Sequence, residues 1–275
     1  MARPNLGYLR NLILFVFGLP CGFLTGLTAI ANSSVVLPML AFLRGIVGRR
    51  ANGTALTVTF FAAFTALLSY GQSHLIHWTL ALVLVIAQIG GARQGQRLMA
   101  VVPKLSKLGI IWAVLVIGLG LTMIHSAVWT HPGSAPQHFG PTAWRLPNSG
   151  ILFYAAACVA GFAVGFVSAV VDLGGVLLVP AVTYALQCPI HEAQGTALLV
   201  LAVAGIAPML LRLRAGEVEP QSAASVSFGA VFGGLVGAFY AVRLSDQLLF
   251  IIYGIVLSAL GLTILWRRPE PTIGS

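Results

Sequence analysis

Charged residues are scarce in this sequence. The 275 residues include 15 Lys and Arg and 6 Asp and Glu, so 8% are charged, against about 25% in an ordinary soluble domain. A soluble chain of this length needs a charged surface, and this composition cannot supply one. With 58% hydrophobic residues, a mean hydropathy of +0.96 and continuous apolar runs, the sequence predicts an all-α polytopic membrane protein.

Acidic residues are absent from the first 171 positions, and all six follow from Asp172 onward. The net charge of +9 comes from basic residues between apolar runs, which is typical of cytoplasmic loops rather than of a nucleic-acid surface. Motifs of other classes are also missing, because there is no Walker A sequence, no HExxH and no GxSxG. The three cysteines have no metal-type spacing. We therefore expect no enzyme, no cofactor and no metal site.

Two apolar runs are too long to be single helices. The run 11–43 would form a helix of roughly 50 Å, but the hydrocarbon core is about 30 Å thick, and the polar cluster Asn32-Ser33-Ser34 lies inside the run. The run 151–187 has the same problem, with Asp172 and Gly174-Gly175 at the matching place. We expect a long helix, a break and a short helix in each region, with each break enclosed by protein or by a water-filled cavity.

An internal repeat divides the chain. Five matches share offsets between 139 and 143 residues, which is too regular for chance matches of small residues. The matching pairs are Gly22-Phe23-x-x-Gly26 with Gly161-Phe162-x-x-Gly165, Val36-Leu37-Pro38 with Leu178-Val179-Pro180, Ala51-Asn52-Gly53-Thr54-Ala55-Leu56 with Ala193-Gln194-Gly195-Thr196-Ala197-Leu198, Gly90-Gly91 with Gly233-Gly234, and Gly120-Leu121-Thr122 with Gly261-Leu262-Thr263. The predicted domains are a first transmembrane repeat, 11–124, and a second, 151–265, joined by an extracytoplasmic linker, 125–150, and flanked by cytoplasmic termini, 1–10 and 266–275.

The basic residues predict a topology. Ten helical segments, eight long and two short after the broken helices, place nearly every basic cluster on one side of the membrane. Five segments in each repeat is an odd number, so the second repeat is inverted relative to the first and both termini are cytoplasmic. Aromatic residues at segment ends, among them Tyr70 and Trp78, are typical of the membrane interface.

Inverted repeats of this kind are typical of secondary transporters, which bind substrate near the membrane midplane at broken helices. Helix N-termini at such breaks favour anions, because free N–H groups and the helix dipole present positive charge. We expect one central site, and the candidate substrate-binding residues are Asn32, Ser33, Ser34, Gly174, Gly175, Asn52, Thr54, Gln194 and Thr196. Ordinary helix capping is the alternative role for the hydroxyl and amide side chains.

Two charged residues carry separate hypotheses. Asp172 is the one acidic residue well inside an apolar stretch, where burial favours the protonated form, so it is a candidate for proton coupling. Its alternative role is that of a helix cap. Arg93 lies at the edge of an apolar run and either contacts an anion or marks the membrane boundary.

The Gly-rich segment from Gly22 to Pro38, the motif from Ala51 to Leu56, Gly90-Gly91 and their second-half partners resemble the TauE/SafE sulfite exporter family, also called the toluenesulfonate uptake permease family. The resemblance covers nearly the whole chain apart from the linker and the termini. It implies an integral protein of the bacterial cytoplasmic (inner) membrane that transports sulfite, a sulfonate or a related organosulfur anion by alternating access.

The partners implied are a small anionic substrate and membrane lipid, with no nucleic acid, and a homo-oligomer is left open. A passive anion channel of the same architecture is the alternative function. An intramembrane enzyme is a weaker alternative, because the sequence has no paired catalytic carboxylates.

Overall fold

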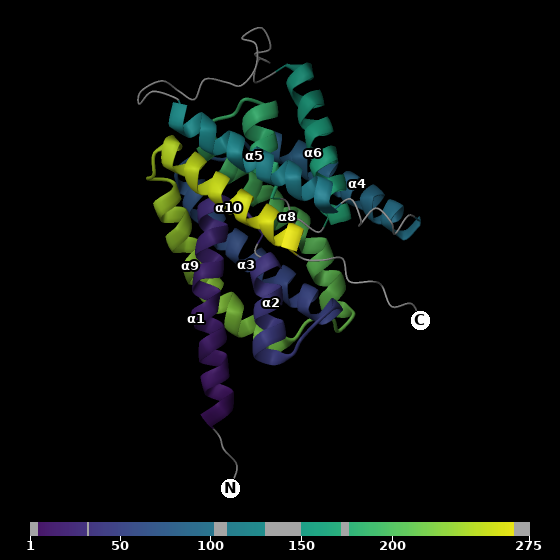
Figure 1. Cartoon of the computed structure of the whole chain (residues 1–275), viewed down its shortest axis with the longest axis vertical. Coiled ribbons are helices and arrows are strands. Elements are labelled where there is room, and N and C mark those ends of the chain that lie inside the picture. Colours follow the sequence, from purple (N-terminus) through teal and green to yellow (C-terminus); the bar gives the residue numbers. More distant parts are fainter. Residues whose placement is uncertain (1–4, 32, 102–108, 130–149, 172–175, 267–275) are drawn as a thin grey trace. The chain divides into compact units, whose positions relative to one another are not determined.

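The chain is all-helical, as predicted. The computed structural model describes residues 5–31, 33–101, 109–129, 150–171 and 176–266, and within them it has ten α-helices, one π-helix and no strand (Figure 1). In chain order they are α1 (Asn5–Thr28), α2 (Ser33–Arg44), α3 (Arg49–Gln72), α4 (Trp78–Val101), α5 (Gly109–Trp129), α6 (Ile151–Val171), α7 (Leu178–Pro180), the π-helix η3 (Ala181–Ala185), α8 (Ile190–Arg214), α9 (Pro220–Ala241) and α10 (Asp246–Trp266).

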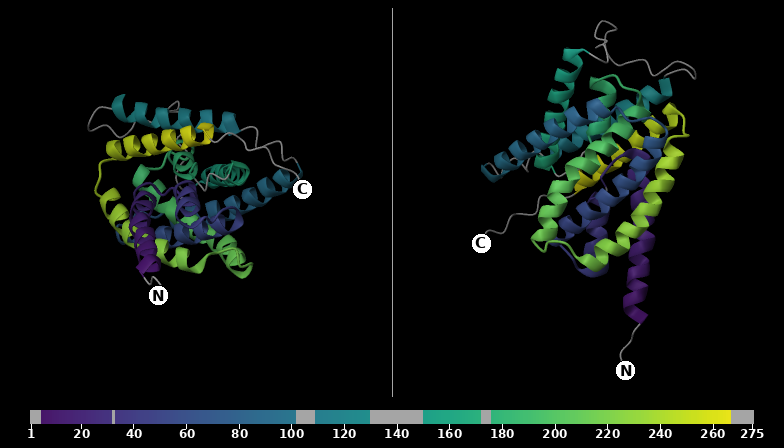
Figure 2. Two further views of the ribbon diagram at one scale, coloured as in Figure 1. Left: turned by 60° about the horizontal axis from the view of Figure 1, so that its bottom comes forward. Right: turned by 180° about the vertical axis from the view of Figure 1, so that it is seen from behind.

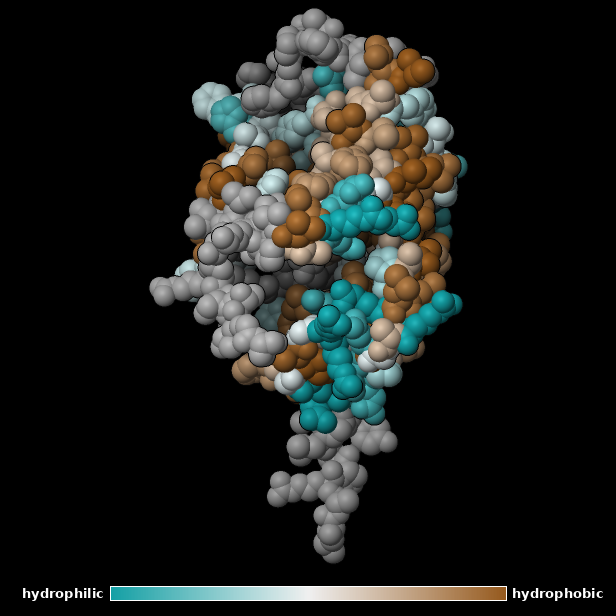
Figure 3. Space-filling view, turned by 90° about the vertical axis from the view of Figure 1, so that its right-hand side faces the viewer, coloured by the Kyte–Doolittle hydropathy of each residue, from teal (hydrophilic) through white to brown (hydrophobic). Residues whose placement is uncertain are grey.

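Seven of the described helices are long and apolar enough to cross a membrane: α1, α3, α5, α6, α8, α9 and α10. Large apolar side chains such as Phe42, Phe61 and Phe228 are exposed, and Figure 3 shows apolar side chains over much of one face. Exposed apolar surface on this scale suits lipid contact rather than water. The remaining long helix, α4, has 24 residues and carries Arg93 and Arg97 in its second half.

The predicted break in the first long run is present. α1 ends at Thr28 and α2 begins at Ser33, and residues 29–31 between them are non-helical and buried. α2 has only 12 residues, which is too short for a membrane crossing. In the second run α6 ends at Val171, and α7 with η3 forms the short helical piece beyond residues 172–175, which lie outside the described residues.

The helices pack as two units, and each unit draws on both halves of the sequence. Unit 1 comprises Met1–Val85 and His191–Leu244, and unit 2 comprises Ile86–Ile190 and Ser245–Ser275. In unit 1, α1 and α3 both pack along α9, and α2 packs against α3 (Figures 1 and 2). The boundaries of the two repeats along the sequence stay a prediction.

Glycines set the spacing between α1 and α9. A Cβ on Gly22 would lie 2.0 Å from the backbone oxygen of Ala230, and a Cβ on Gly233 would lie 2.0 Å from that of Leu19. The two backbones therefore touch, a packing mode that membrane helices use often. Each helix presents three glycines at intervals of four residues: Gly18, Gly22 and Gly26 on α1, and Gly229, Gly233 and Gly237 on α9.

In unit 2, α5 and α10 pack side by side. A Cβ on Gly120 would lie 2.7 Å from the backbone oxygen of Gly254, and a Cβ on Gly261 would lie 3.0 Å from that of Ala113. Gly261 follows Gly120 by 141 residues, and Gly254 follows Ala113 by 141. Each contact therefore maps onto the other, as a duplicated unit with two-fold symmetry requires. Inversion of the repeats across a membrane stays a prediction.

One sequence match does not predict the packing partners. A Cβ on Gly91 would lie 2.0 Å from the backbone oxygen of Phe162, and the corresponding contact, with Phe23, is made by Gly237 at 2.2 Å. Gly237 follows Gly91 by 146 residues, about one helical turn beyond the match of Gly90-Gly91 with Gly233-Gly234. The first part of α9 is thus about one turn longer than its counterpart in α4.

Candidate substrate site

The end of α1 is a buried polar region in unit 1. The Thr25 hydroxyl donates to the carbonyl of Ile30 over 2.9 Å, and the Thr28 hydroxyl donates to that of Leu24 over 2.7 Å. Ala29 follows the last helical residue with φ at 53°, a left-handed conformation that costs a non-glycine residue roughly 1–3 kcal/mol. The helix therefore stops inside the protein, where its last carbonyl groups need donors other than water.

Gln194, near the start of α8, supplies one of those donors. Its Nε2 donates to the carbonyl of Leu27, in the last turn of α1, over 3.2 Å. Its Oε1 accepts a hydrogen bond of 2.8 Å from the hydroxyl of Tyr70, near the end of α3. Both side chains are 0% exposed. The Tyr70 hydroxyl thus fixes the amide orientation, with the oxygen toward α3 and the NH2 group toward the end of α1.

Tyr70 corrects one expectation from the sequence. Its position at a segment end predicted an aromatic ring at the membrane interface, but the residue is fully buried and its hydroxyl is bonded to Gln194. A segment end in the sequence can lie inside the protein when another helix starts against it, as α8 does here. The sequence carries no local signal that separates the two environments.

The repeated motif makes the same contacts in both copies. The N–H of Glu219, just before α9, donates to Thr54 Oγ1 over 3.1 Å, and the N–H of His77, just before α4, donates to Thr196 Oγ1 over 3.2 Å. Thr196 follows Thr54 by 142 residues, and Glu219 follows His77 by 142. Each threonine therefore satisfies a free N–H at the entry to a helix on another part of the chain.

The glycine before each threonine completes this arrangement. A Cβ on Gly53 would lie 2.0 Å from the carbonyl oxygen of Glu217, and a Cβ on Gly195 would lie 2.3 Å from that of Leu75. Only glycine allows the connecting chain to lie directly on the helix at these points. We call the contact of Gly53 and Thr54 with residues 217–219 the basic junction, and that of Gly195 and Thr196 with residues 75–77 the neutral junction.

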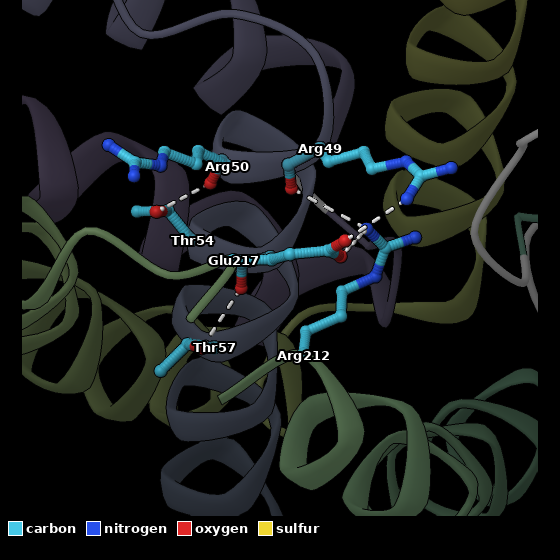
Figure 4. Close-up of polar contacts among 7 residues, drawn as sticks. Arg49, Arg50, Thr54, Thr57, Arg212 and Glu217 are labelled. Carbon is cyan, nitrogen blue, oxygen red and sulfur yellow. Dashed lines mark hydrogen bonds and ion pairs between the residues drawn. The ribbon is translucent and has the colours of Figure 1, made fainter. Parts of the chain in front are cut away.

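Arginines surround the basic junction (Figure 4). Glu217 pairs with Arg49, at 3.5 Å, and with Arg212, at 3.3 Å, so one carboxylate joins the start of α3 to the end of α8. Thr54 also donates to the carbonyl of Arg50 over 2.8 Å. Nearby, Arg44 at the end of α2 donates to the side chain of Asn11. Three basic clusters that the topology prediction assigns to the cytoplasm thus belong to one packing unit.

Arg44 shows how crowded this positive region is. Desolvation lowers the pKa of its guanidinium, and the nearby charge of Arg10 lowers it further, while Glu219 acts in the opposite direction. The group stays charged in any case, because an arginine pKa starts far above neutral pH.

In unit 2, the second break is held by a tyrosine. Pro180 has no N–H, so the carbonyl of Val176 lacks its helical donor, and the hydroxyl of Tyr253 donates to it over 3.2 Å. Tyr253 is fully buried. The π-helix η3 follows directly, and Tyr184 within it lies 3.3 Å from the hydroxyl of Ser126.

The remaining predicted residues stand as follows. Asn52, which occupies the place of Gln194 in the other copy, is half-buried, and Arg93 is exposed on α4 in unit 2. Ser33 and Ser34 begin α2, but their side chains lie outside the described part of the chain. Four others lie wholly outside the described residues: Asn32, Asp172, Gly174 and Gly175. Within the described residues, no three His, Cys, Asp or Glu side chains gather as metal ligands would.

Seven candidate spans, an apolar surface and a helix broken inside the protein define a polytopic membrane protein. The family model described as "Sulfite exporter TauE/SafE" matches residues 2–123 and again residues 106–264. The chain belongs to this family, and it is a membrane transporter of the TauE/SafE type. Two separate matches also agree with the internal repeat.

Curated relatives carry the same general function in their names. A "Probable membrane transporter protein" of Xylella fastidiosa (strain 9a5c) is 25% identical over 249 residues, which cover 90% of this chain and 91% of the relative. A "Probable membrane transporter protein YunE" of Bacillus subtilis (strain 168) is 24% identical over 271 residues, which cover 93% of this chain and 97% of the relative. No solved structure matches the chain.

Proposed function

We propose that this protein is a secondary transporter that moves a small sulfur-containing anion, such as sulfite or a sulfonate, across the bacterial cytoplasmic membrane by alternating access. The family name points to the sulfur anion. The observation that carries the proposed site is Gln194, a fully buried amide held against the end of a broken helix.

Gln194 is suited to bind an anion. A primary amide has two N–H donors, and Gln194 Nε2 has one recorded acceptor, the Leu27 carbonyl. Because Tyr70 holds the amide oxygen, the second N–H stays on the side of the α1 break. A neutral donor in a water-excluded site binds an oxyanion strongly without adding a fixed charge. Thr54 and Thr196 act beside it as positioning residues, through the two junctions.

We propose further donors at the break itself. The side chains of Asn32, Ser33 and Ser34 lie next in sequence after the buried residues 29–31, and the first turn of α2 adds backbone N–H groups. At the second break we propose that Gly174 and Gly175 expose backbone N–H groups, and that Asp172 binds a proton together with the anion. A protonated carboxyl would not repel the anion, so the two binding events favour each other.

The site is tested by changing Gln194 in the whole protein. In proteoliposomes, Gln194→Glu should abolish or greatly slow uptake of sulfite and methanesulfonate, because the new carboxylate repels the anion. Gln221→Glu, the same change at an exposed position of α9, should leave uptake unchanged. Equal uptake by wild type and Gln194→Glu would remove Gln194 from the site.

The substrate class is tested by ligand-dependent thermal stabilisation. A ligand that binds only the native state raises its stability, so sulfite, thiosulfate, sulfonates and carboxylates can be compared on the purified protein. Stabilisation by carboxylates alone would contradict the sulfur-anion proposal.

The proton hypothesis has its own variant. Asp172→Asn should keep anion binding but lose its pH dependence and the uptake driven by a proton gradient. Unchanged pH dependence would assign Asp172 to helix capping instead.

A passive anion channel of the same architecture is the second candidate, since a channel also needs polar donors along its path. Flux measured against a substrate gradient, with a proton gradient applied, separates the two. Uphill accumulation supports the transporter, and flux that only dissipates gradients supports the channel.

We also propose that both termini are cytoplasmic. The arginines joined in unit 1 around Asn11, Arg44 and Glu217 support a cytoplasmic face there. A cysteine introduced in the linker by Ser134→Cys should react with an impermeant reagent only from outside the cell. Labelling only from the cytoplasmic side would overturn the topology.

A further inference from the structure

The threonines of α3 differ in one respect. Thr54 and Thr57 donate to carbonyl groups of their own helix, those of Arg50 and Gly53, and Thr65 donates to Phe61 and Ala62 in the same way. This is the usual behaviour of a hydroxyl in an apolar helix. Thr59 Oγ1 is buried, with 5% of the residue exposed, and among the described residues it has no hydrogen-bond partner.

Two serines on α9 share this property. Ser222 is 0% exposed and Ser227 is 6% exposed, and neither hydroxyl has a hydrogen-bond partner in the part of the chain that the structure describes. A buried hydroxyl without a partner destabilises the folded state. Three of them on two helices that pack together call for a ligand or water that satisfies them in another step of the working cycle.

The register of α3 and α9 brings these hydroxyls to one stretch of the pair. Gly53 contacts the carbonyl of Glu217 at one end, and Gly234 contacts the carbonyl of Ala62 further along. At 1.5 Å per residue, Thr59 lies about 9 Å along α3 from Gly53, and Ser227 lies roughly 10 Å along α9 from its start. Their neighbours Val58 and Val226 belong to one buried apolar cluster.

The charges at this end favour an anion. The N–H groups of the first turn of α9, where Ser222 lies, face the positive end of the helix dipole. Glu217 is already paired with Arg49 and Arg212, and Glu219 immediately precedes the helix. Hydroxyls donate to oxyanions but hold them less tightly than arginines do, which suits a place that an ion passes through.

We propose that Thr59, Ser222 and Ser227 form a second, hydroxyl-lined subsite for a small oxyanion, on the way between the arginine-rich basic junction and the end of α1. The proposal rests on the proposed transport function. In the conformation described, the α3–α9 pair is closed around the three hydroxyls. Binding at this subsite requires the two helices to separate and admit the anion with some of its water.

The first test removes hydroxyls without changing shape. Thr59→Val and Ser227→Ala together should raise the KM for sulfite or methanesulfonate uptake by roughly tenfold or more, since each lost hydrogen bond to a charged group has about that effect. Thr57→Val is the matched control, because Thr57 lies on the same helix, is also buried and donates to its own backbone. The control should keep the wild-type KM.

The melting temperature separates this subsite from a merely structural role. The double variant loses two unsatisfied hydroxyls, so it should melt at or above the wild-type temperature while its uptake falls. Unchanged uptake by a double variant that melts higher would overturn the proposal and leave the hydroxyls as packing defects.

The second test does not depend on the substrate. In a background without Cys21, Cys158 and Cys188, Ser227→Cys should react with an impermeant sulfonate-bearing thiol reagent, and sulfite should slow the reaction. Phe228→Cys is the control, because its neighbouring position is exposed on the apolar surface. Absence of labelling at position 227 under transport conditions would overturn the subsite even if uptake by the wild type supports the proposed function. Failure of wild-type uptake with every anion tested would instead remove the proposed function.

Discussion

The basic junction and the neutral junction use one backbone device in two chemical settings. In both, a glycine lets a connecting segment lie on a helix, and the next residue, a threonine, accepts a hydrogen bond from the N–H just before another helix. Around the first copy lie Arg49, Arg212 and Glu217. Around the second lies the uncharged pair of Tyr70 and Gln194.

The difference teaches which part of the repeat is scaffold and which part is specialised. Glycine and threonine are the same in both copies because the backbone contact is the same. The residue just before them differs, Asn52 in one copy and Gln194 in the other. The longer side chain of Gln194 reaches the Leu27 carbonyl and the Tyr70 hydroxyl, so the neutral junction is connected to the α1 break.

The largest expected effect comes from adding a methyl group at either glycine. Gly53→Ala and Gly195→Ala should each lower the free energy of unfolding by about 1–3 kcal/mol, because the new Cβ overlaps a backbone carbonyl. Thermal unfolding of the purified protein measures this. Gly205→Ala on α8, where a Cβ would meet nothing within 4 Å, should be neutral or slightly stabilising. A neutral result at only one junction would show that the two contacts are not equivalent.

The threonines should come next. Thr54→Val and Thr196→Val each leave a backbone N–H without its acceptor, and we expect losses of about 1–2 kcal/mol for each. Serine at the same positions keeps the hydroxyl and should restore most of the stability. If valine and serine behave alike at either position, the hydroxyl does not stabilise that junction.

Tyr70→Phe sharpens the comparison, because the basic junction has no counterpart of this hydroxyl. The variant should lose about 1 kcal/mol of stability and should also weaken sulfite binding, since the Gln194 amide is then free to rotate. Tyr240→Phe, an exposed tyrosine on α9, is the control for both measurements. A loss of stability with unchanged binding would limit Tyr70 to a structural role.

The smallest effect is expected at the charged side. Glu217→Gln breaks both ion pairs, but the Arg49 side chain is 86% exposed, and such pairs contribute about 0–1 kcal/mol. The difference in melting temperature from wild type should shrink as salt is raised. A large loss that salt does not reduce would mean that Glu217 is held in a less exposed setting than this structure shows.

The sequence was informative where a physical limit applies to a single run of residues. The break after α1 could be predicted because one helix over residues 11–43 would exceed the membrane thickness and because polar residues interrupt it. The repeated motif identified Gly53, Thr54 and their partners as a pair. Their role at the junctions could not be predicted, because the groups they contact, at Glu217 and Leu75, are distant in sequence.

Other features needed the three-dimensional structure for equally specific reasons. Glycines are abundant, 31 in the chain, so a local Gly-Gly match selected Gly233-Gly234 rather than Gly237, one turn away. The ion pair of Arg49 with Glu217 joins opposite halves of the chain, and neither residue has a local pattern that names the other. For the same reason the unpartnered hydroxyls of α9 were indistinguishable from ordinary helix serines.

The glycine contacts between α1 and α9 have a mechanical consequence. Sliding one helix along the other by a single residue would drive side chains such as Leu19 and Phe23 against a backbone that now lies beside hydrogen atoms. We therefore expect the pair to travel as one stiff rod through the transport cycle. The bending that alternating access requires would then fall on the three non-helical residues that follow α1, next to the Gln194 amide.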